Sequence, residues 1–110
     1  MPVGTAEKVT ALSRDFGSQR RLAELLGVDP AQVTRWRRRQ GIDELNAAKV
    51  DLLELVTATL MRLYPQEAAQ RWLLGTNPSL GGRRPIDLIR RGRAQEVLEA
   101  LANERAGGYA

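Results

Sequence analysis

Residues 19–40 read QRRLAELLGVDPAQVTRWRRRQ, and this stretch decides the fold of the chain around it. Gly27 stands at its ninth position, where one helix has to turn into the next, and glycine adopts the left-handed backbone of such a turn without steric cost. This spacing predicts a helix-turn-helix. The inward side chains are expected to be Leu22, Ala23, Leu26, Val28, Val33 and Trp36.

The start of the second helix carries several signals in the same register. Asp29 is a capping residue, Pro30 takes the first helical position, and Gln32 at the third position can close a capping box. Val33 and Trp36 are three residues apart and therefore share the inward face. The agreement of these signals favours a helix-turn-helix over the alternative, an ordinary helical hairpin whose arginines are only a solvated surface.

The outer face of this second helix suits a DNA major groove. Arginine is the commonest bidentate partner of guanine, glutamine pairs with adenine, and further guanidinium groups suit phosphates. We therefore expect DNA contacts from Gln19, Ala31, Gln32, Thr34, Arg35, Arg37, Arg38 and Arg39.

The composition bounds the class of protein. A chain of 110 residues with 43% hydrophobic and 27% charged residues can bury a core, so it is not a disordered tail. The net charge is +4, and 15 of the 17 basic residues are arginine. Residues 1–60 carry nine basic and eight acidic side chains, so the charge of the predicted DNA-binding half is local and centred on Arg35 to Arg39.

The absence of certain residue types excludes several kinds of chemistry. Without cysteine there are no disulfides and no cysteine metal sites, and without histidine the commonest metal ligand and general base are missing. Apolar runs fall far short of the roughly 18 residues of a membrane span, and the start MPVGTAEK lacks the apolar stretch of a signal peptide. We therefore expect a reduced, cytoplasmic, non-enzymatic protein with no metal, cofactor or membrane partner.

The rest of the chain also predicts helices. Residues 6–16 form a first helix that completes the small core, and residues 43–63 form a long amphipathic helix. Its apolar positions exceed what a lone surface helix needs, which leaves part of it for a second lobe or a dimer partner. We expect its inward face to hold Leu45, Ala48, Leu52, Leu55, Val56, Thr59, Leu60 and Leu63.

Three shorter helices follow Tyr64-Pro65, at residues 66–74, 85–91 and 93–104. A loop with defined turns, TNPSLGGRRP, separates the first two. The predicted fold is therefore all-α, with a helix-turn-helix domain at residues 1–60 joined by the long helix to a small helical lobe at residues 61–110. Inward positions of the last helix are Ala94, Val97, Leu98 and Leu101, and both Trp36 and Trp72 are expected to be buried.

The segment RWLLGTNPSLGGRRPIDLIRRGRAQEVLEAL, residues 71–101, resembles the toxin-binding domain shared by the Xre/MbcA/ParS-type antitoxins. With a helix-turn-helix in front, the resemblance covers nearly the whole chain. The matching elements are Trp72-Leu73, Asn77-Pro78, Leu80 with Gly81-Gly82, Pro85 with Asp87-Leu88, and Gly92 followed by Val97, Leu98 and Leu101.

This resemblance implies a function. Family members are all-helical, dimerising antitoxins encoded beside a toxin with a RES domain, which consumes NAD, so the chain is expected to bind such a toxin and to repress its own operon by binding operator DNA. The expected toxin-binding residues are Trp72, Asn77, Leu80, Arg83, Arg84, Arg90, Arg91, Arg93, Glu99, Asn103, Glu104, Arg105, Tyr109 and Ala110.

The end of the chain, AGGYA at residues 106–110, has two interpretations. It is either a frayed terminus or a tail that a partner orders. In the second case the last helix and its tail form a plug for the toxin's substrate site, with Tyr109 stacking in place of the cofactor's ring and the carboxylate of Ala110 meeting phosphate-binding arginines.

Several alternatives stay open at this stage. The five arginines between Arg83 and Arg93 suit surface charge, a second phosphate-binding patch, or an acidic toxin surface equally well. The chain could also be a stand-alone regulator whose C-terminal lobe only dimerises, or a binding module whose helix-turn-helix has lost its DNA affinity. A toxin gene next door separates the antitoxin from the other two, and a gel shift separates the last from the rest.

Overall fold

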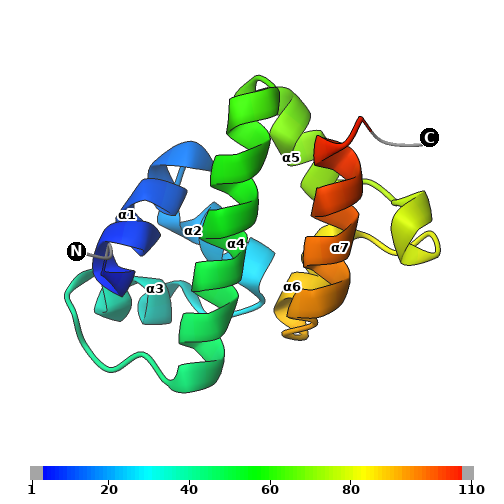
Figure 1. Cartoon of the computed structure of the whole chain (residues 1–110). Coiled ribbons are helices and arrows are strands. Elements are labelled where there is room, and N and C mark those ends of the chain that lie inside the picture. The colour runs from blue at the N-terminus through cyan, green and yellow to red at the C-terminus, as the bar shows by residue number, and fades with distance from the viewer. Residues whose placement is uncertain (1–3, 108–110) are drawn as a thin grey trace. The chain divides into compact units, whose positions relative to one another are not determined.

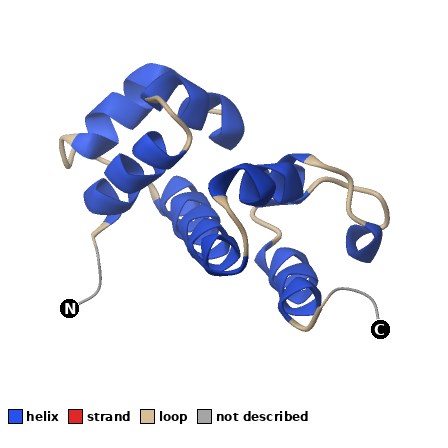
Figure 2. Ribbon diagram, turned by 90° about the horizontal axis from the view of Figure 1, so that it is seen from above, coloured by secondary structure: helices blue, strands red, loops and turns tan. Residues whose placement is uncertain are grey.

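The computed structural model describes residues 4–107, and within that range it is all-helical, with seven α-helices, one 3₁₀ turn and no strand (Figures 1 and 2). The predicted all-α class is therefore confirmed. Contacts divide the chain into two compact units, residues 1–54 and residues 55–110, with the division inside the long helix. We call them the N-terminal unit and the C-terminal unit and describe each by itself.

The N-terminal unit contains α1 (Thr5–Asp15), α2 (Gln19–Leu26), α3 (Pro30–Arg37) and the first part of α4 (Glu44–Leu63). Helices α1, α2 and α3 pack on one another (Figure 1). Val9, Leu12 and Phe16 of the predicted first helix are buried, and Trp36 is only 4% exposed, as expected. The core of this unit is made by Val9, Leu12, Phe16, Leu22, Ala23, Leu25, Leu26, Val33, Trp36, Val50, Leu52 and Leu53.

The turn between α2 and α3 has the backbone that the sequence predicts. Gly27 has φ 71° and ψ 36°, in the left-handed region, and the Val28 N–H donates to the Ala23 carbonyl at 3.0 Å. Two details differ from expectation. Leu25 is buried as well, and Val28 is only half-buried because it lies in the turn itself.

The inward face of α4 was predicted only in part. Leu52, Val56 and Leu60 are buried as expected, and so are Val50, Leu53 and Thr57, which the prediction omitted. Apolar residues cover more than half of the helix circumference, so periodicity alone does not select which part faces the core. Thr59 is half-buried, and the expected inward residues that are exposed instead are Leu45, Ala48, Leu55 and Leu63.

The C-terminal unit contains the end of α4, then α5 (Gln66–Leu74), η1 (Pro78–Leu80), α6 (Pro85–Arg90) and α7 (Ala94–Arg105). Helix α6 packs on α5 and on α7, and η1 packs on α7. Its core includes Ala69, Leu73, Leu80, Ile86, Leu88, Ile89, Val97, Ala100 and Leu101.

Helix α7 is rotated relative to the prediction. Val97 and Leu101 are buried as expected, but Leu98 is 38% exposed and Ala94 is exposed. Ala100 is buried in their place, because three-residue spacing from Val97 puts it on the same face. None of the helices in the described residues combines the length and the apolar character needed to cross a membrane.

Candidate functional site

At the start of α3, Ala31 and Gln32, which were expected to contact DNA, form hydrogen bonds with Asp29. The Asp29 carboxylate accepts a hydrogen bond from the Ala31 N–H at 2.8 Å, and the Gln32 Oε1 accepts one from the Asp29 N–H at 3.3 Å. This is the predicted capping box. The Gln32 oxygen is therefore engaged in starting the helix, and its amide group keeps two N–H donors for a base edge.

A second polar contact joins α2 to α3. The Thr34 hydroxyl donates to the Gln19 Oε1 at 2.9 Å, and both side chains are half-buried. Gln19 and Thr34 therefore fix the two helices against each other. The expected DNA contacts that are exposed are Ala31, Arg35, Arg37, Arg38 and Arg39.

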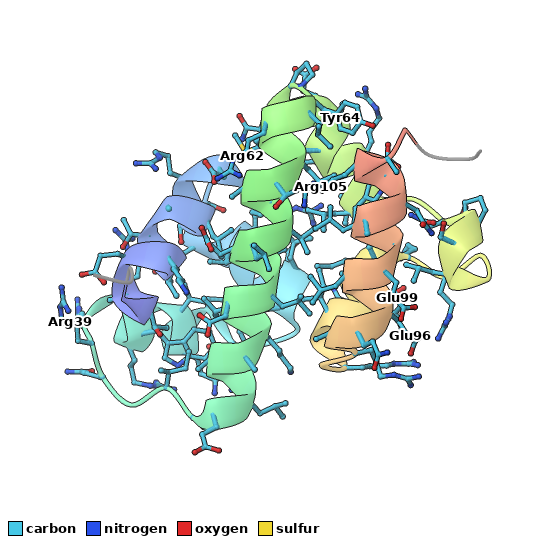
Figure 3. All side chains as sticks on the ribbon, in the orientation of Figure 1. Arg39, Arg62, Tyr64, Glu96, Glu99 and Arg105 are labelled. Atoms are coloured by element: carbon cyan, nitrogen blue, oxygen red, sulfur yellow. The ribbon has the colours of Figure 1, made fainter. Side chains whose placement is uncertain are left out.

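Arg39 lies beyond the end of α3. The helix ends at Arg37, Arg38 is its C-cap, and Arg39 has φ 61°, a left-handed backbone that is uncommon outside glycine. Its guanidinium forms an ion pair with Glu7 of α1, and its side chain is 73% exposed (Figure 3). Because exposed ion pairs contribute little, a phosphate can compete with Glu7 for this arginine.

The end of α7 is anchored by a carboxylate that the resemblance assigns to toxin binding. Glu104 accepts hydrogen bonds from the hydroxyl of Tyr64, which follows α4 and is labelled in Figure 3, and from the Trp72 indole N–H of α5 at 3.0 Å. The bond to Glu104 raises the pKa of Tyr64 above its usual value. Trp72 is half-buried rather than buried as expected, because its polar edge reaches this carboxylate at the surface.

A small cavity of about 130 Å³ lies beside this anchor and gathers Trp72, Asn77, Asn103 and Glu104, all expected toxin-binding residues. The Asn77 Oδ1 accepts from the Ser79 N–H at 2.8 Å, and the Asn103 amide donates to the Ser79 hydroxyl at 3.3 Å. Asn77 therefore shapes the turn before η1. Leu80 is 2% exposed and packs in the core, so its side chain does not face a partner.

The arginines form a separate surface. Arg83, Arg84, Arg90 and Arg91 line a cleft of about 360 Å³ together with Gly82, Asp87 and Leu88. Arg93 lies outside this lining and pairs with Glu96. Glu99, one turn from Glu96 on α7, is exposed (Figure 3).

Sequence reasoning missed the roles of Asp87 and Glu96. The Arg84 guanidinium donates through Nε and Nη2 to both oxygens of Asp87 at 2.9 Å, and this lowers the pKa of that carboxyl. Arg83 lowers the pKa of Glu96 in the same way. The three-residue spacing from Arg84 to Asp87 was a usable signal, since residues three apart on a helix are neighbours.

The remaining expected site residues lie at the end of the chain. Arg105 is the last residue of α7 and is exposed, whereas Tyr109 and Ala110 lie outside the described residues. The C-terminal unit thus presents two places of different character, the anchor around Glu104 and the arginine-lined cleft.

Comparison with known proteins gives a consistent result. Residues 53–107 match the family model of the antitoxin Xre/MbcA/ParS C-terminal toxin-binding domain. The chain is 32% identical over 88 residues to the mycobacterial cidal antitoxin MbcA of Mycobacterium tuberculosis and of Mycobacterium bovis, covering 79% of this chain and 77% of each relative.

A solved structure extends the similarity to the whole chain. The crystal structure of the M. tuberculosis MbcT–MbcA toxin–antitoxin complex contains a chain that superposes with a TM-score of 0.77 at 25% identity, covering 99% of this chain and 100% of that one. The matched family segment also coincides closely with the C-terminal unit. The chain belongs to the Xre/MbcA/ParS family of antitoxins.

Proposed function

We propose that this antitoxin acts on two partners: its C-terminal unit binds and inhibits an NAD-degrading toxin with a RES domain, and its N-terminal unit binds operator DNA to repress the operon. The observation that carries the toxin half is the match of residues 53–107 to a toxin-binding domain. It is supported by whole-chain similarity to a protein whose structure was solved in a toxin–antitoxin complex.

The toxin-binding surface we propose is the face around Glu104. Trp72, Asn77 and Asn103 meet there at one cavity, and Arg105 follows at the helix end from which the tail continues. Anchoring by Tyr64 and Trp72 holds this end of α7 in a defined place, so a tail leaving it starts from a fixed point. A fixed starting point lowers the entropy cost of placing the tail in a partner's site.

The test is co-expression with the product of the adjacent gene. We expect the toxin alone to stop growth and deplete NAD, and the antitoxin to restore both and to co-purify with the toxin. A neighbouring gene product that is harmless, or that is not retained by the antitoxin, would contradict the toxin half of the proposal. Operator binding is measured separately and does not depend on this result.

Binding of the antitoxin to its operator is expected to depend on Arg35. Removing one guanidinium that contacts a base edge costs on the order of 1–3 kcal/mol at the cognate site and relaxes specificity there. Arg39→Ala is the matched comparison, because the loss of a phosphate contact should weaken binding to all sequences alike and flatten the salt dependence. Fluorescence anisotropy with cognate and scrambled duplexes measures both, and unchanged affinities for the two variants would rule out this face of α3.

Self-association is expected along α4. Two copies reading half-sites about one helical turn apart would supply the surface that one small domain lacks on DNA. Helix α4 leaves Leu45, Leu55 and Leu63 exposed at 57%, 48% and 44%. These are large apolar side chains on a single helix, which a second copy of the chain would cover.

Leu55→Glu is therefore expected to dissociate the dimer, because it would place two like charges in an apolar contact. Light scattering at micromolar concentration should give the mass of a dimer for the unchanged antitoxin and of a monomer for the variant. Leu98→Glu is the control, since Leu98 is similarly exposed, at 38%, but lies on α7. A monomeric mass for the unchanged antitoxin would refute the dimer.

Glu104→Ala is expected to lower the melting temperature by roughly 4–8 °C, since it removes the acceptor of two hydrogen bonds. Glu104→Gln keeps one acceptor oxygen for the Trp72 N–H and offers an amide N–H to the Tyr64 hydroxyl oxygen, so it should recover most of that loss. Circular dichroism during heating measures the effect. If the alanine variant melts like the unchanged chain, the contacts to Tyr64 and Trp72 do not anchor α7.

A further inference from the structure

The cleft lined by Arg83, Arg84, Arg90 and Arg91 is a concentrated positive surface within the C-terminal unit, and we call it the arginine cleft. Its volume of about 360 Å³ is enough to admit a phosphate group with part of its sugar. The only acidic residue in its lining is Asp87. The cleft therefore carries a clear excess of positive charge.

Three of the guanidinium groups are held in place by neighbouring groups, since Arg90 also pairs with the Asp87 carboxylate at 3.6 Å. Arg84 is bound to both oxygens of Asp87, and the Arg83 Nε donates to the Leu80 carbonyl at 2.8 Å while its terminal nitrogen pairs with Glu96 at 2.6 Å. Pre-oriented guanidinium groups lose little side-chain entropy when they bind a planar or tetrahedral oxyanion. The cleft is thus organised before any ligand enters it.

The surface of the cleft differs from that of a protein-binding patch. Protein interfaces usually centre on exposed aromatic or aliphatic anchors, whereas DNA interfaces are polar and strongly positive. Leu88 is the one apolar residue in the lining, and it is 1% exposed. The accessible groups are glycine, aspartate and arginine, which is the character of a phosphate-binding surface.

The distribution of charge along the chain also favours phosphate binding by the C-terminal unit. Residues 1–54 carry nine basic and eight acidic side chains, a net charge of +1, whereas residues 55–110 carry eight basic and five acidic ones, a net charge of +3. Most sequence-independent affinity for DNA comes from neutralising phosphates. The unit with the predicted recognition helix supplies little of that net charge, and the unit with the arginine cleft supplies most of it.

We infer that the arginine cleft binds backbone phosphates of the operator DNA. This inference rests on the proposed operator binding and adds a second DNA contact in the unit assigned to the toxin. Arg91 and Arg90 make phosphate contacts, while Arg83 and Arg84 keep their places through Leu80, Glu96 and Asp87. A bound toxin that covers this unit would then lower the affinity of the antitoxin for DNA.

The test uses the full antitoxin and a duplex containing its operator, with the dissociation constant measured from 50 to 300 mM salt. Each phosphate contact contributes about 0.9 to the slope of log K against log salt. Replacing both Arg90 and Arg91 with glutamine should therefore flatten the slope by roughly 1.8 and weaken binding at least tenfold at low salt. Arg91→Gln alone should give about half that change of slope. This single variant replaces the double variant in the test if the double variant has a lowered melting temperature.

Arg62→Gln is the matched control for Arg91→Gln, because it also removes one positive charge, from an exposed residue of the same unit outside the cleft. It should leave the slope within about 0.3 of the unchanged value. A slope equally flattened by Arg62→Gln, or unaffected by loss of Arg90 and Arg91, would overturn the inference. The toxin affinity of the double variant is measured alongside, and a loss of toxin affinity with normal DNA binding would instead assign the cleft to an acidic toxin surface.

Different results would refute operator binding and the role of the arginine cleft. If the unchanged antitoxin binds the operator and Arg35→Ala weakens it while the cleft variants do not, only the arginine cleft is wrongly assigned. If the unchanged antitoxin binds no duplex at any salt concentration, the operator function fails and this inference fails with it.

Discussion

Replacing Trp36 with alanine is expected to lower the free energy of unfolding by about 3–5 kcal/mol, the usual loss when a buried tryptophan is truncated. The side chain is 4% exposed and lies on the inward face of α3, where it packs with Val33 into the core of the N-terminal unit. The free energy of unfolding of a small domain is only about 5–15 kcal/mol, so this one change removes a large share of the stability. Operator binding is expected to be lost with it.

Urea unfolding monitored by circular dichroism measures this loss. Arg35→Ala is the control on the same helix, since Arg35 is exposed and its removal should change stability by less than about 0.5 kcal/mol. A midpoint for Trp36→Ala equal to that of the unchanged chain would mean that α3 does not pack as described.

Deleting Arg105 to Ala110 is expected to restore NAD consumption by the toxin within the complex, while folding and operator binding stay intact. We propose that the antitoxin inhibits the toxin by covering its substrate site, and the tail beyond α7 is the segment we propose for that role. Ordering Gly107 and Gly108 costs roughly 1–2 kcal/mol of backbone entropy per residue, so the tail must make compensating contacts. The deletion should therefore also weaken toxin binding, but only modestly.

Tyr109→Ala provides a smaller change in the same segment. It should restore part of the NAD consumption if the ring stacks in the toxin's cofactor site. Full inhibition by the truncated antitoxin would exclude the tail as the plug, and inhibition would then have to come from the surface around Glu104.

The boundaries of the helices were largely predictable because local signals mark them. The cap at Asp29, the glycine at position 27 and the proline at position 65 each act within one turn of the chain, so their effect is visible in the sequence. Predicted and observed bounds agree for α5 and differ by one residue, at one or both ends, for α1, α4, α6 and α7.

The packing faces and the site contacts were less predictable, because they depend on residues distant in the sequence. The burial of Thr57 and the exposure of Leu55 follow from which side of α4 meets the core, which its broad apolar surface does not specify. Glu104 meets Tyr64 across 40 residues, and Arg39 meets Glu7 across 32. No periodicity or spacing rule indicates such pairs.

The most direct test of the proposed function is a titration of purified toxin with this antitoxin while NAD consumption is followed. We predict that inhibition becomes complete at a fixed molar ratio near stoichiometry, and that a higher NAD concentration slows the onset of inhibition because antitoxin and NAD compete for one site. Tight binding that leaves NAD consumption unchanged, or no inhibition at any ratio, would contradict the account.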